Sequence, residues 1–383
     1  MELSIVIVSY NIRYFLEQCL YAVQRASAQL QTEVYVVDNN STDGSVAYLS
    51  ALFPEVHFIA NKQNLGFAKA CNQPLPLCQG KYILFLNPDT IVAEDTFSAC
   101  VQFMDANEKA GALGCRMIDG AGNFLQESKR SFPSASVSFY KLSGLSSLFP
   151  SSTKFNKYVL GHLPEDQVHM VDVLCGAFMM VRQDVLLKLK GFDEDYFMYA
   201  EDIDLSYRIK KAGYRNYYFP GTTIVHFKGE SSKQDENKHL HLFYGAMKIF
   251  VRKHYWAGKA GLYSNLLTLA IYLRAAISFF SLPLKLIKGR NKTKKIKNFQ
   301  LIGDEEAVST LQKRLRQKMA EASAIKDEKP GAAIFCINRF SCKQAIEMLS
   351  LSYKQQEVRW HHHGSGSVVG STDKDATGQV IVL

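Results

Sequence analysis

Short apolar runs alternate with amphipathic segments along the first 90 residues, a pattern that predicts alternating strands and helices. The runs expected to form strands are Leu3–Val8, Glu33–Val37, Val56–Ala60 and Tyr82–Leu86. Helices are expected between them, at Ile12–Ala26, after Ser41-Thr42-Asp43-Gly44, and at Gly66–Cys78. Strands that are apolar throughout and separated by helices are typical of a parallel sheet covered on both faces, so the predicted class is α/β.

Polar residues follow three of these strands directly. They are Ser9-Tyr10-Asn11, Asp38-Asn39 and Asn87-Pro88-Asp89. Because sheets of this kind bind ligands beyond the carboxyl ends of their strands, we expect the three clusters to share one site at one edge of the sheet.

A cluster of acidic residues opens an expected helix further along the chain. Glu201, Asp202 and Asp204 lie there, and acids at this position also stabilise a helix N-terminus. Residues two apart on a helix point to different faces, so one acid can serve a site while another pairs with Arg208. Asp202 is the candidate general base.

Candidate metal ligands come from two places in the chain. Asp89 offers a hard oxygen ligand for Mg²⁺ or Mn²⁺, and an imidazole such as His226 suits borderline metals. His226 follows an expected strand at Tyr217–Pro220 and an expected turn at Gly221-Thr222. Turn aspartates and buried histidines are common, so neither residue identifies a metal site by itself.

Seven motifs, in this order along roughly residues 1–230, resemble the family 2 glycosyltransferases. The pattern is most similar to the rhamnosyltransferase-like and galactofuranosyltransferase-like members. The motifs are Val8-Ser9-Tyr10-Asn11, Val37-Asp38-Asn39-Asn40-Ser41-Thr42-Asp43-Gly44-Ser45, Asn64-Leu65-Gly66-Phe67-Ala68, Leu86-Asn87-Pro88-Asp89, Gly176-Ala177-Phe178-Met179, Gly191-Phe192-Asp193-Glu194 and Glu201-Asp202.

The resemblance implies a GT-A fold, inversion at the anomeric carbon, and a Mg²⁺ or Mn²⁺ cofactor. It also implies Asp202 as the catalytic base, Asp89 and His226 at the metal, and Gly176 and Glu201 on the acceptor side. The first acid of the D-x-D motif is replaced by Asn87, so Asp89 remains as the direct ligand. The residues expected to bind the nucleotide-sugar are Ser9, Tyr10, Asn11, Asp38, Asn64, Gly66, Lys69 and Asn87.

By the same resemblance the protein is a non-processive enzyme that uses a nucleotide-diphosphate sugar. The first expectation for the donor is dTDP-rhamnose, and the expected acceptor is a cell-envelope glycan or a lipid-linked precursor. The alternative is a non-catalytic nucleotide-sugar-binding scaffold at the membrane. The enzyme is favoured over the scaffold, because this sequence contains the full set of Asp38, Asp89, Asp202 and His226.

The positive charge of the chain lies in one segment. The stretch 237–303 contains thirteen Lys and Arg and no acids, and since the whole chain carries +9, the remainder carries −4. Its apolar part, 261–284, contains Arg274 as its only charge and is followed by a lysine-rich run. We expect it to lie in the interface of an anionic membrane rather than to span it, because a central charge is costly in a bilayer.

A buried helix with a solvated basic flank is the alternative for this segment. Nucleic acid is not an expected partner, because the basic run lacks interleaved aromatic residues. The predicted domains are therefore a GT-A catalytic domain at 1–235, a basic membrane-associating helical segment at 236–297, and an accessory module at 298–383. The expected location is the cytoplasmic face of the inner membrane, with peripheral attachment.

The last segment predicts a small Rossmann-like α/β module without an assigned function. Strands are expected at Phe299–Gly303 and Ala332–Ile337, and helices at Glu305–Ala322 and Cys342–Ser350. Two further motifs follow. The first, Gln356-Glu357-Val358-Arg359-Trp360, fits the Q-x-x-R-W motif of processive synthases, but it lies about 150 residues after Asp202 and is interpreted as coincidence. The second, His361-His362-His363, is expected in a solvated loop.

Cysteine usage and the start of the chain bear on the compartment. None of the eight cysteines forms a C-x-x-C pair, and most lie in apolar runs, so we expect reduced core residues. Met1-Glu2-Leu3 leads directly into a strand-like run with no signal-peptide pattern, which favours the cytosol. The stretch Ser128–Gln167 is expected to be either a mobile loop near the acceptor or a surface insertion without a role.

Overall fold

The computed structural model describes nine stretches of the chain. Among the described residues, no helix combines the length and the apolar character needed to cross a membrane. The apolar part of the basic segment lies outside the described residues, so its predicted membrane association stays a prediction. The described stretches are residues 1–133, 148–149, 152–153, 158–228, 236–254, 299–320, 332–354, 356–371 and 378–383.

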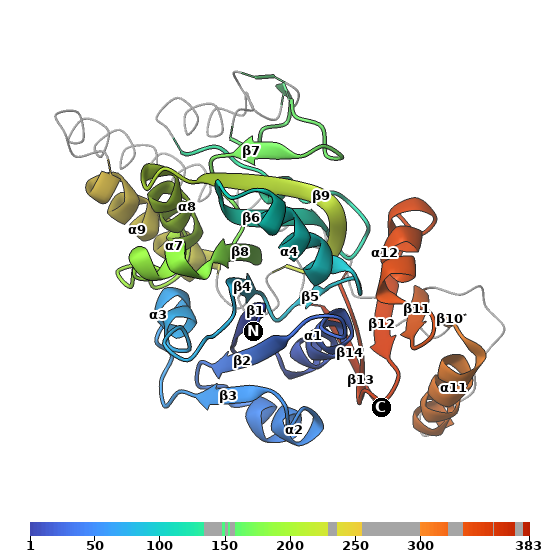
Figure 1. Cartoon of the computed structure of the whole chain (residues 1–383). Helices are drawn as coiled ribbons and strands as arrows, with labels where there is room; N and C mark the ends of the chain where they lie inside the picture. The colour runs from blue at the N-terminus through green and yellow to red at the C-terminus, as the bar shows by residue number, and fades with distance from the viewer. Residues whose placement is uncertain are drawn as a thin grey trace.

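The first four strands form the parallel half of a nine-stranded sheet, as predicted (Figure 1). Their order is β3-β2-β1-β4, and the three helices that connect them follow the strands in turn. The bounds are β1 (Leu3–Ser9), α1 (Arg13–Ala26), β2 (Thr32–Asp38), α2 (Ser45–Leu52), β3 (His57–Ala60), α3 (Phe67–Asn72) and β4 (Tyr82–Leu86).

The predicted helix at Gly66–Cys78 is too long. Helix α3 ends at Asn72, because Pro74 and Pro76 follow closely. A proline lacks a backbone donor and restricts the residue before it, so the chain leaves the helical conformation there.

The second half of the sheet is mixed. Strand β8 pairs antiparallel with β4 and with β6, β9 lies parallel to β6, and the short β5 and β7 pair antiparallel with β9. The bounds are β5 (Thr90–Ile91), α4 (Thr96–Ala106), β6 (Ala110–Ile118), η1 (Gln126–Ser128), β7 (His169–Val171), β8 (Phe178–Arg182), α7 (Gln183–Lys188), α8 (Glu201–Lys211), β9 (Arg215–His226) and α9 (Glu236–His254).

The expected turn at Gly221-Thr222 is wrong, because both residues lie inside the twelve-residue strand β9. The register against β6 jumps from Phe219 to Thr223, opposite Cys115 and Arg116. Residues at such an irregularity do not take part in the regular ladder, which is where a strand tolerates proline and glycine.

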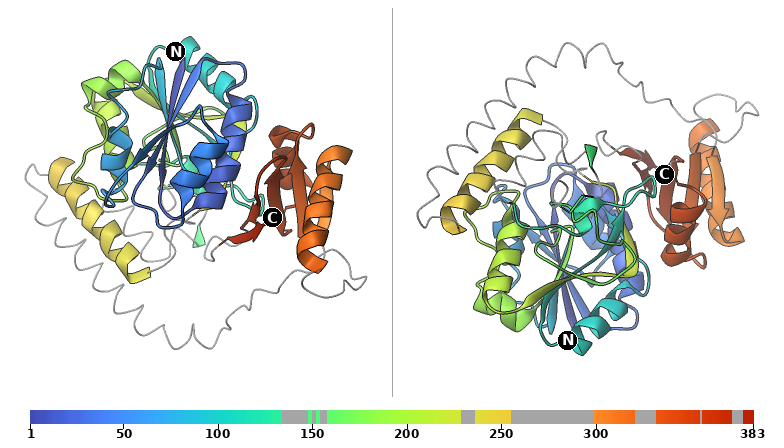
Figure 2. Two further views of the ribbon diagram at one scale, coloured as in Figure 1. Left: turned by 90° about the horizontal axis from the view of Figure 1, so that it is seen from below. Right: turned by 90° about the horizontal axis from the view of Figure 1, so that it is seen from above.

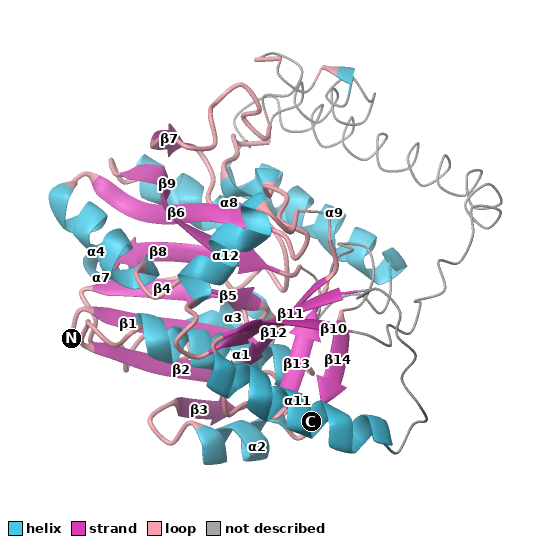
Figure 3. Cartoon of the chain, turned by 90° about the vertical axis from the view of Figure 1, so that its right-hand side faces the viewer, coloured by secondary structure: helices cyan, strands magenta, loops and turns pink. Residues whose placement is uncertain are grey.

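Helices cover both faces of this sheet, which confirms the predicted α/β class (Figure 3). Alternate residues of β1 divide between two hydrophobic clusters. Ile5 and Ile7 pack with α1 and α4 on one face, and Val6 and Val8 pack with α3 and α8 on the other. This alternation is the period of two expected of a strand buried on both sides.

The C-terminal module, defined here as the described residues of 299–383, is the predicted small α/β unit. Its five-stranded sheet has the order β10-β11-β12-β13-β14, and its first three strands are parallel. It lies beside α1 (Figure 2). The bounds are β10 (Phe299–Gly303), α11 (Glu305–Ala320), β11 (Ala332–Ile337), α12 (Cys342–Leu351), β12 (Val358–His362), β13 (Ser367–Gly370) and β14 (Gln379–Val382).

The first two histidines of the run lie in a buried strand, so the expected solvated loop is wrong for them, while His363 lies in the turn that follows and is partly exposed. His361 and His362 are 1% and 2% exposed in β12. Each imidazole is buried with a partner: His361 Nδ1 lies 2.9 Å from the Ser367 carbonyl oxygen, and His362 Nδ1 lies 2.9 Å from Gln18 Oε1. These partners offset the cost of burying a polar ring.

All eight cysteines are free thiols, as predicted, and seven of them are buried while Cys175 is partly exposed. Trp360 of the Q-x-x-R-W motif is also buried and packs edge-on against Phe335, with ring centroids 5.3 Å apart. In this chain Val358, Arg359 and Trp360 of the motif are therefore buried in the C-terminal module, while Gln356 is exposed.

Trp360→Ala is expected to lower the free energy of unfolding by about 3–5 kcal/mol, because it removes a large buried side chain and leaves a cavity. Urea unfolding followed by near-ultraviolet circular dichroism measures this loss. Leu351→Ala is the control, since Leu351 is 83% exposed in the same module, and it should change stability by no more than about 0.5 kcal/mol. Equal stability of the two variants would contradict the assignment of Trp360 to the core.

Candidate active site

The first two polar clusters meet at the carboxyl ends of β1 and β2. Ser9 and Asp38 are paired in register, and Asn39 N donates to the Ser9 carbonyl oxygen at 2.8 Å. Asp38 is 3% exposed and accepts a hydrogen bond from Ser41 N through Oδ2. Its Oδ1 and the Ser9 hydroxyl are buried without a hydrogen-bond partner among the described residues. Such atoms are suited to hydrogen-bond a ligand.

The loop after β1 is held against the loop after β2. Asn11 adopts a left-handed backbone conformation with φ of 50°. Its side-chain oxygen accepts from Thr42 N at 2.7 Å, and its backbone N–H donates to Ser41 Oγ at 2.8 Å. Tyr10, which lies between Ser9 and Asn11 in the chain, is 38% exposed. These contacts fix the rim of the site next to Asp38.

A glycine loop connects this rim to the acidic helix. Asn64 Oδ1 accepts from Gly66 N at 2.9 Å, and Asn39 Nδ2 donates to the Gly66 carbonyl oxygen at 3.1 Å. Gly66 has φ of +84°, and a Cβ there would lie 2.6 Å from the Phe197 carbonyl oxygen. Only glycine fits this conformation and this close approach. Phe67 N donates to the same Phe197 oxygen at 2.7 Å. The glycine loop therefore contacts the segment that leads into α8.

The third polar cluster faces His226 across a short antiparallel ladder. Thr90 of β5 pairs with His226 of β9, and Phe227 N donates to the Asp89 carbonyl oxygen at 3.0 Å. As a result His226 Nε2 lies 3.3 Å from Asp89 Oδ1 and 3.3 Å from Asn87 Nδ2. Asp89 and His226 are almost completely buried.

Asp89 and His226 fit a divalent ion that is shared with a substrate, but they do not form a complete metal site. Among the described residues, no group of three or more His, Cys, Asp or Glu side chains is placed to hold a metal ion. Mg²⁺ bound in nucleotide sites commonly uses one or two protein carboxylates, with phosphate oxygens and water as the other ligands. His226 Nδ1 is buried without a partner among the described residues.

Asp202 lies at the start of α8 in an ion pair. Its Oδ2 lies 2.5 Å from Arg130 Nη2 and accepts from Gly176 N at 3.3 Å. The Arg130 guanidinium also donates to the Leu174 carbonyl oxygen at 2.6 Å. Both charged side chains of the pair are nearly buried, with exposed fractions of 11% and 13%. The carboxylate is therefore held in one orientation, beside the backbone of Gly176.

Glu201 is buried next to Asp202, and it has no cation of its own. Its Oε2 has no hydrogen-bond partner among the described residues. Burial, and then the nearby Asp202 carboxylate, raise the pKa of Glu201 from 4.5 to about 8. The two residues before it, Tyr199 and Ala200, have φ of 70° and 60°. Left-handed conformations at consecutive non-glycine residues are strained, and such strain clusters at functional sites.

Strand pairing brings the Asp89 side and the Asp202 side together. Asn87 N donates to the Ala177 carbonyl oxygen at 3.0 Å, and Gly176, the next residue, contacts Asp202. The structure thus places four predicted residues within one run of contacts: Asn87, Asp89, Gly176 and Asp202. The residues predicted to bind the nucleotide approach the start of α8 through Gly66, which lies against Phe197.

Three charged residues near the site were not predicted from the sequence. Arg130 pairs with Asp202, and Glu127 forms an ion pair with Lys228 at 2.5 Å. Lys228 lies two residues after His226 in the chain. The adjacent cations Lys129-Arg130 were a visible signal, but nothing in the sequence shows which acid they meet.

Lys69 stands apart from the other predicted site residues. It is exposed on α3, and no hydrogen bond or ion pair among the described residues links it to them. Its predicted contact with the nucleotide-sugar stays a prediction.

Comparisons with known proteins show similarity to glycosyltransferases. Residues 4–188 match the family model described as glycosyl transferase family 2. An N-acetylglucosaminyl-diphospho-decaprenol L-rhamnosyltransferase of Mycobacterium tuberculosis (strain CDC 1551 / Oshkosh) is 28% identical over 260 residues, which cover 65% of this chain and 83% of that protein. The rhamnosyltransferase WbbL of Escherichia coli (strain K12) is 34% identical over 152 residues, 38% of this chain and 52% of that protein.

Two solved structures are also similar. TarS 1–349 of S. aureus aligns with a TM-score of 0.44 and 17% identity, over 74% of this chain and 73% of that chain. The mannosyltransferase PcManGT of Pyrobaculum calidifontis, solved with GDP-Man and Mn²⁺, aligns with a TM-score of 0.47 and 17% identity, over 76% of this chain and 81% of that chain.

Glu201→Gln is expected to remove a pH dependence of stability. Between pH 4.5 and about 8 the folded chain keeps the Glu201 proton and the unfolded chain loses it, so the free energy of unfolding falls as pH rises. Glutamine carries no such proton. Relative to the native chain, the variant should therefore gain at least about 1.4 kcal/mol between pH 5 and pH 8.5, the equivalent of one pKa unit.

Urea unfolding at the two pH values measures this difference. Exposed Glu108→Gln controls for the loss of one carboxyl group. A Glu201→Gln variant whose stability follows the native chain at both pH values would show that Glu201 is an ordinary ionised carboxylate.

Proposed function

Residues 4–188 match the glycosyl transferase family 2 model, and from this premise we propose that the protein is an inverting, non-processive glycosyltransferase. It moves one sugar from a nucleotide-diphosphate donor to a hydroxyl group of a cell-envelope glycan or a lipid-linked acceptor. The observation that carries the proposal is the junction at Asn87 and Ala177. On this observation we assign the Asp89–His226 pair and the Asp202 carboxylate to one site.

The donor proposed first is dTDP-rhamnose. Two relatives that share 28% and 34% identity with this chain are rhamnosyltransferases, which supports this sugar. Asp38 Oδ1 and the Ser9 hydroxyl are buried and unpartnered among the described residues, which supports recognition of polar groups of a nucleoside there.

In the proposed reaction, the acceptor oxygen attacks the anomeric carbon from the side of Asp202. The new carbon–oxygen bond forms as the bond to the diphosphate oxygen breaks, which inverts the configuration. Asp202 takes the proton of the attacking hydroxyl group. Arg130 and Gly176 N hold the carboxylate in place, so little reorganisation is needed when the proton moves.

The leaving diphosphate requires positive charge on the opposite side of the site. Mg²⁺ or Mn²⁺ held by Asp89, with His226 beside it, would supply that charge when bound. The amide of Asn87 provides a neutral hydrogen-bonding group at the same place, 3.3 Å from His226 Nε2. Asp89 is the carboxylate that would hold the ion there, so phosphate oxygens and water would supply its other ligands.

A non-catalytic scaffold would not need these features. Binding a nucleotide-sugar requires the Asp38 side alone, whereas here a buried ion pair orients Asp202 and a strained backbone precedes it. Maintaining a buried ion pair and strain is costly, which supports catalysis over binding alone.

We place the reaction at the cytoplasmic face of a membrane, with peripheral attachment. One rhamnosyltransferase relative is named for a diphospho-decaprenol acceptor, which supports a lipid-linked acceptor for this chain. The basic stretch 237–303 would hold the enzyme near anionic lipids. Sedimentation of the full chain with anionic vesicles tests this, and equal binding to neutral vesicles would contradict it.

Asp202→Asn is expected to keep donor binding and to lower kcat by about 10²–10⁴-fold, because it removes the base and preserves the shape of the side chain. Donor turnover and donor affinity, measured separately with Mn²⁺ present, check this expectation. Asp204→Asn is the matched control on the same helix. Asp204 pairs with Arg208 and His254, at 2.6 Å in each case, so its loss should lower stability more than kcat. Near-native turnover in Asp202→Asn would reject the catalytic role.

The identity of the donor is tested by thermal shift with a panel of nucleotide-diphosphate sugars and Mn²⁺. We expect dTDP-rhamnose to raise Tm most, since a ligand that binds only the folded chain stabilises it. Asp89→Ala should abolish the part of the shift that depends on Mn²⁺. If no panel member shifts Tm, with or without Mn²⁺, the donor assignment fails.

A further inference from the structure

A buried polar interface joins the C-terminal module to α1. Glu17 and Gln18 lie mid-helix and are 0% exposed. The Glu17 carboxylate accepts hydrogen bonds from Gly366 N at 2.7 Å, from Ser367 Oγ at 2.5 Å and from Tyr48 Oη at 2.7 Å. A buried carboxylate needs such donors, because leaving it unpaired is strongly unfavourable. Two of the three come from the module.

Gln18 is matched just as completely. Its amide nitrogen donates to Ser365 Oγ at 2.9 Å and to the Ser367 carbonyl oxygen at 3.1 Å, and its oxygen accepts from His362 N at 2.9 Å. A polar network with this degree of satisfaction specifies one docking geometry. The module is therefore fixed on α1 in a defined orientation.

A second contact lies just after the metal-side residues. The Glu94 carboxylate accepts from Cys342 N at 2.8 Å and from Lys343 N at 3.0 Å, which are the first two amides of α12, and it also pairs with Arg25 at 2.9 Å. An acid at this position satisfies helix N–H groups that have no intrahelical partner. Helix α12 is thus capped in part by the catalytic domain.

A third contact involves a glycine hairpin after β6. A Cβ at Gly120 would lie 1.8 Å from the Ser371 carbonyl oxygen, and one at Gly122 would lie 2.6 Å from the Leu349 carbonyl oxygen. The hairpin and the module are therefore in backbone contact at two points. The chain runs from this hairpin directly into Arg130, which holds Asp202.

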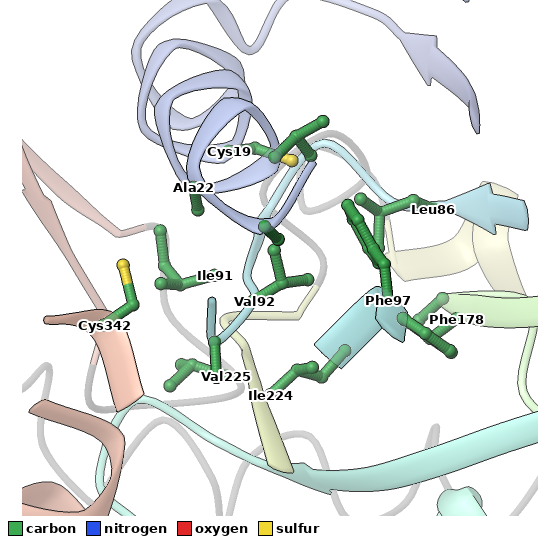
Figure 4. Packing of buried hydrophobic residues seen from close by; sticks show 14 of the residues in the cluster. Cys19, Ala22, Leu86, Ile91, Val92, Phe97, Phe178, Ile224, Val225 and Cys342 are labelled. Carbon is green, nitrogen blue, oxygen red and sulfur yellow. The ribbon is translucent and has the colours of Figure 1, made fainter. Parts of the chain in front are cut away.

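The apolar side of the interface backs the β5–β9 ladder (Figure 4). Ile91 and Val225 are paired in this ladder, one residue beyond the pair of Thr90 with His226. Both belong to the same buried cluster as Cys342 of α12. On the other side, Cys19 Sγ of α1 lies 3.6 Å from Thr90 Oγ1.

We propose that the C-terminal module is a positioning element of the catalytic centre. By packing on α1, on Glu94 and on the glycine hairpin, it fixes the segments that present Asp89, His226 and Arg130. A two-stranded ladder of two residues per strand has little stability of its own, so its geometry depends on what packs against it. For its effect on turnover, the inference rests on the glycosyltransferase function proposed above.

Two variants of the full chain loosen the module without touching the site. In Gly366→Val, the new side chain starts 2.3 Å from Tyr48 Oη and 3.5 Å from Glu17 Oε1, and it therefore disturbs the hydrogen bonds that join Glu17 to the module. Glu94→Gln weakens the cap of α12. The matched controls are Gly245→Val, at a glycine whose Cβ meets nothing within 4 Å, and Glu347→Gln, at an exposed position of α12.

Hydrogen exchange and steady-state kinetics are measured for each variant. We expect faster exchange in the module at 341–370 and, with it, at 86–95 and 222–228. We also expect kcat to fall by about 10–100-fold, since small misplacements of catalytic groups have effects of this size. The donor KM should change less than kcat, because Asp38 lies away from the module contacts. Both controls should match the native chain.

Faster exchange in the module, with native exchange at 86–95 and 222–228 and native kcat, overturns the proposal. So does unchanged exchange everywhere in both variants, because these contacts would then not hold the module. The exchange readout does not require turnover. If the native chain transfers no sugar, the proposed function is rejected. Hydrogen exchange alone then decides the positioning inference.

Discussion

The pairing of β5 with β9 is the constraint on which the site depends. Only two residue pairs make up this ladder, Thr90 with His226 and Ile91 with Val225. It is nevertheless the feature that sets Asp89 against His226 at 3.3 Å. So short a ladder holds its geometry only where its apolar side is packed, and here α1 and α12 provide that packing (Figure 4). The packing of the core therefore also sets the geometry of the proposed catalytic site.

Charge balance is the second constraint. A diphosphate would enter a site that already contains four acids: Asp38, Asp89, Glu201 and Asp202. The structure limits the repulsion in two ways. Glu201 keeps its proton at neutral pH because it is buried, and Asp202 faces Arg130. The remaining negative charge at Asp89 is what a divalent cation would neutralise.

Local patterns in the sequence were enough to predict the parallel half of the sheet and the polar residues at its edge. Continuous apolar strands such as Tyr82–Leu86 have few alternatives, and the residue that follows such a strand must lie at the sheet edge. The small α/β module was predictable for the same reason.

Contacts between distant segments were not predictable. Arg130 and Asp202 are 72 positions apart, and Glu17 and Ser367 are 350 apart. Nothing local to either residue identifies its partner. The histidines of β12 were misplaced for a related reason: their burial depends on Gln18 and Ser367, which supply hydrogen bonds that the sequence around His361 does not reveal.

The central claim is that Asp89, His226 and Asp202 serve one sugar-nucleotide site. A crystal structure of the full chain with dTDP and Mn²⁺, with the ion located by anomalous scattering, tests it most directly. The account predicts one Mn²⁺ peak that bridges the Asp89 carboxylate and the diphosphate, with the nucleoside against Asp38 and the terminal phosphate directed toward Asp202. A nucleotide bound elsewhere, or an ion bound away from Asp89, would contradict it.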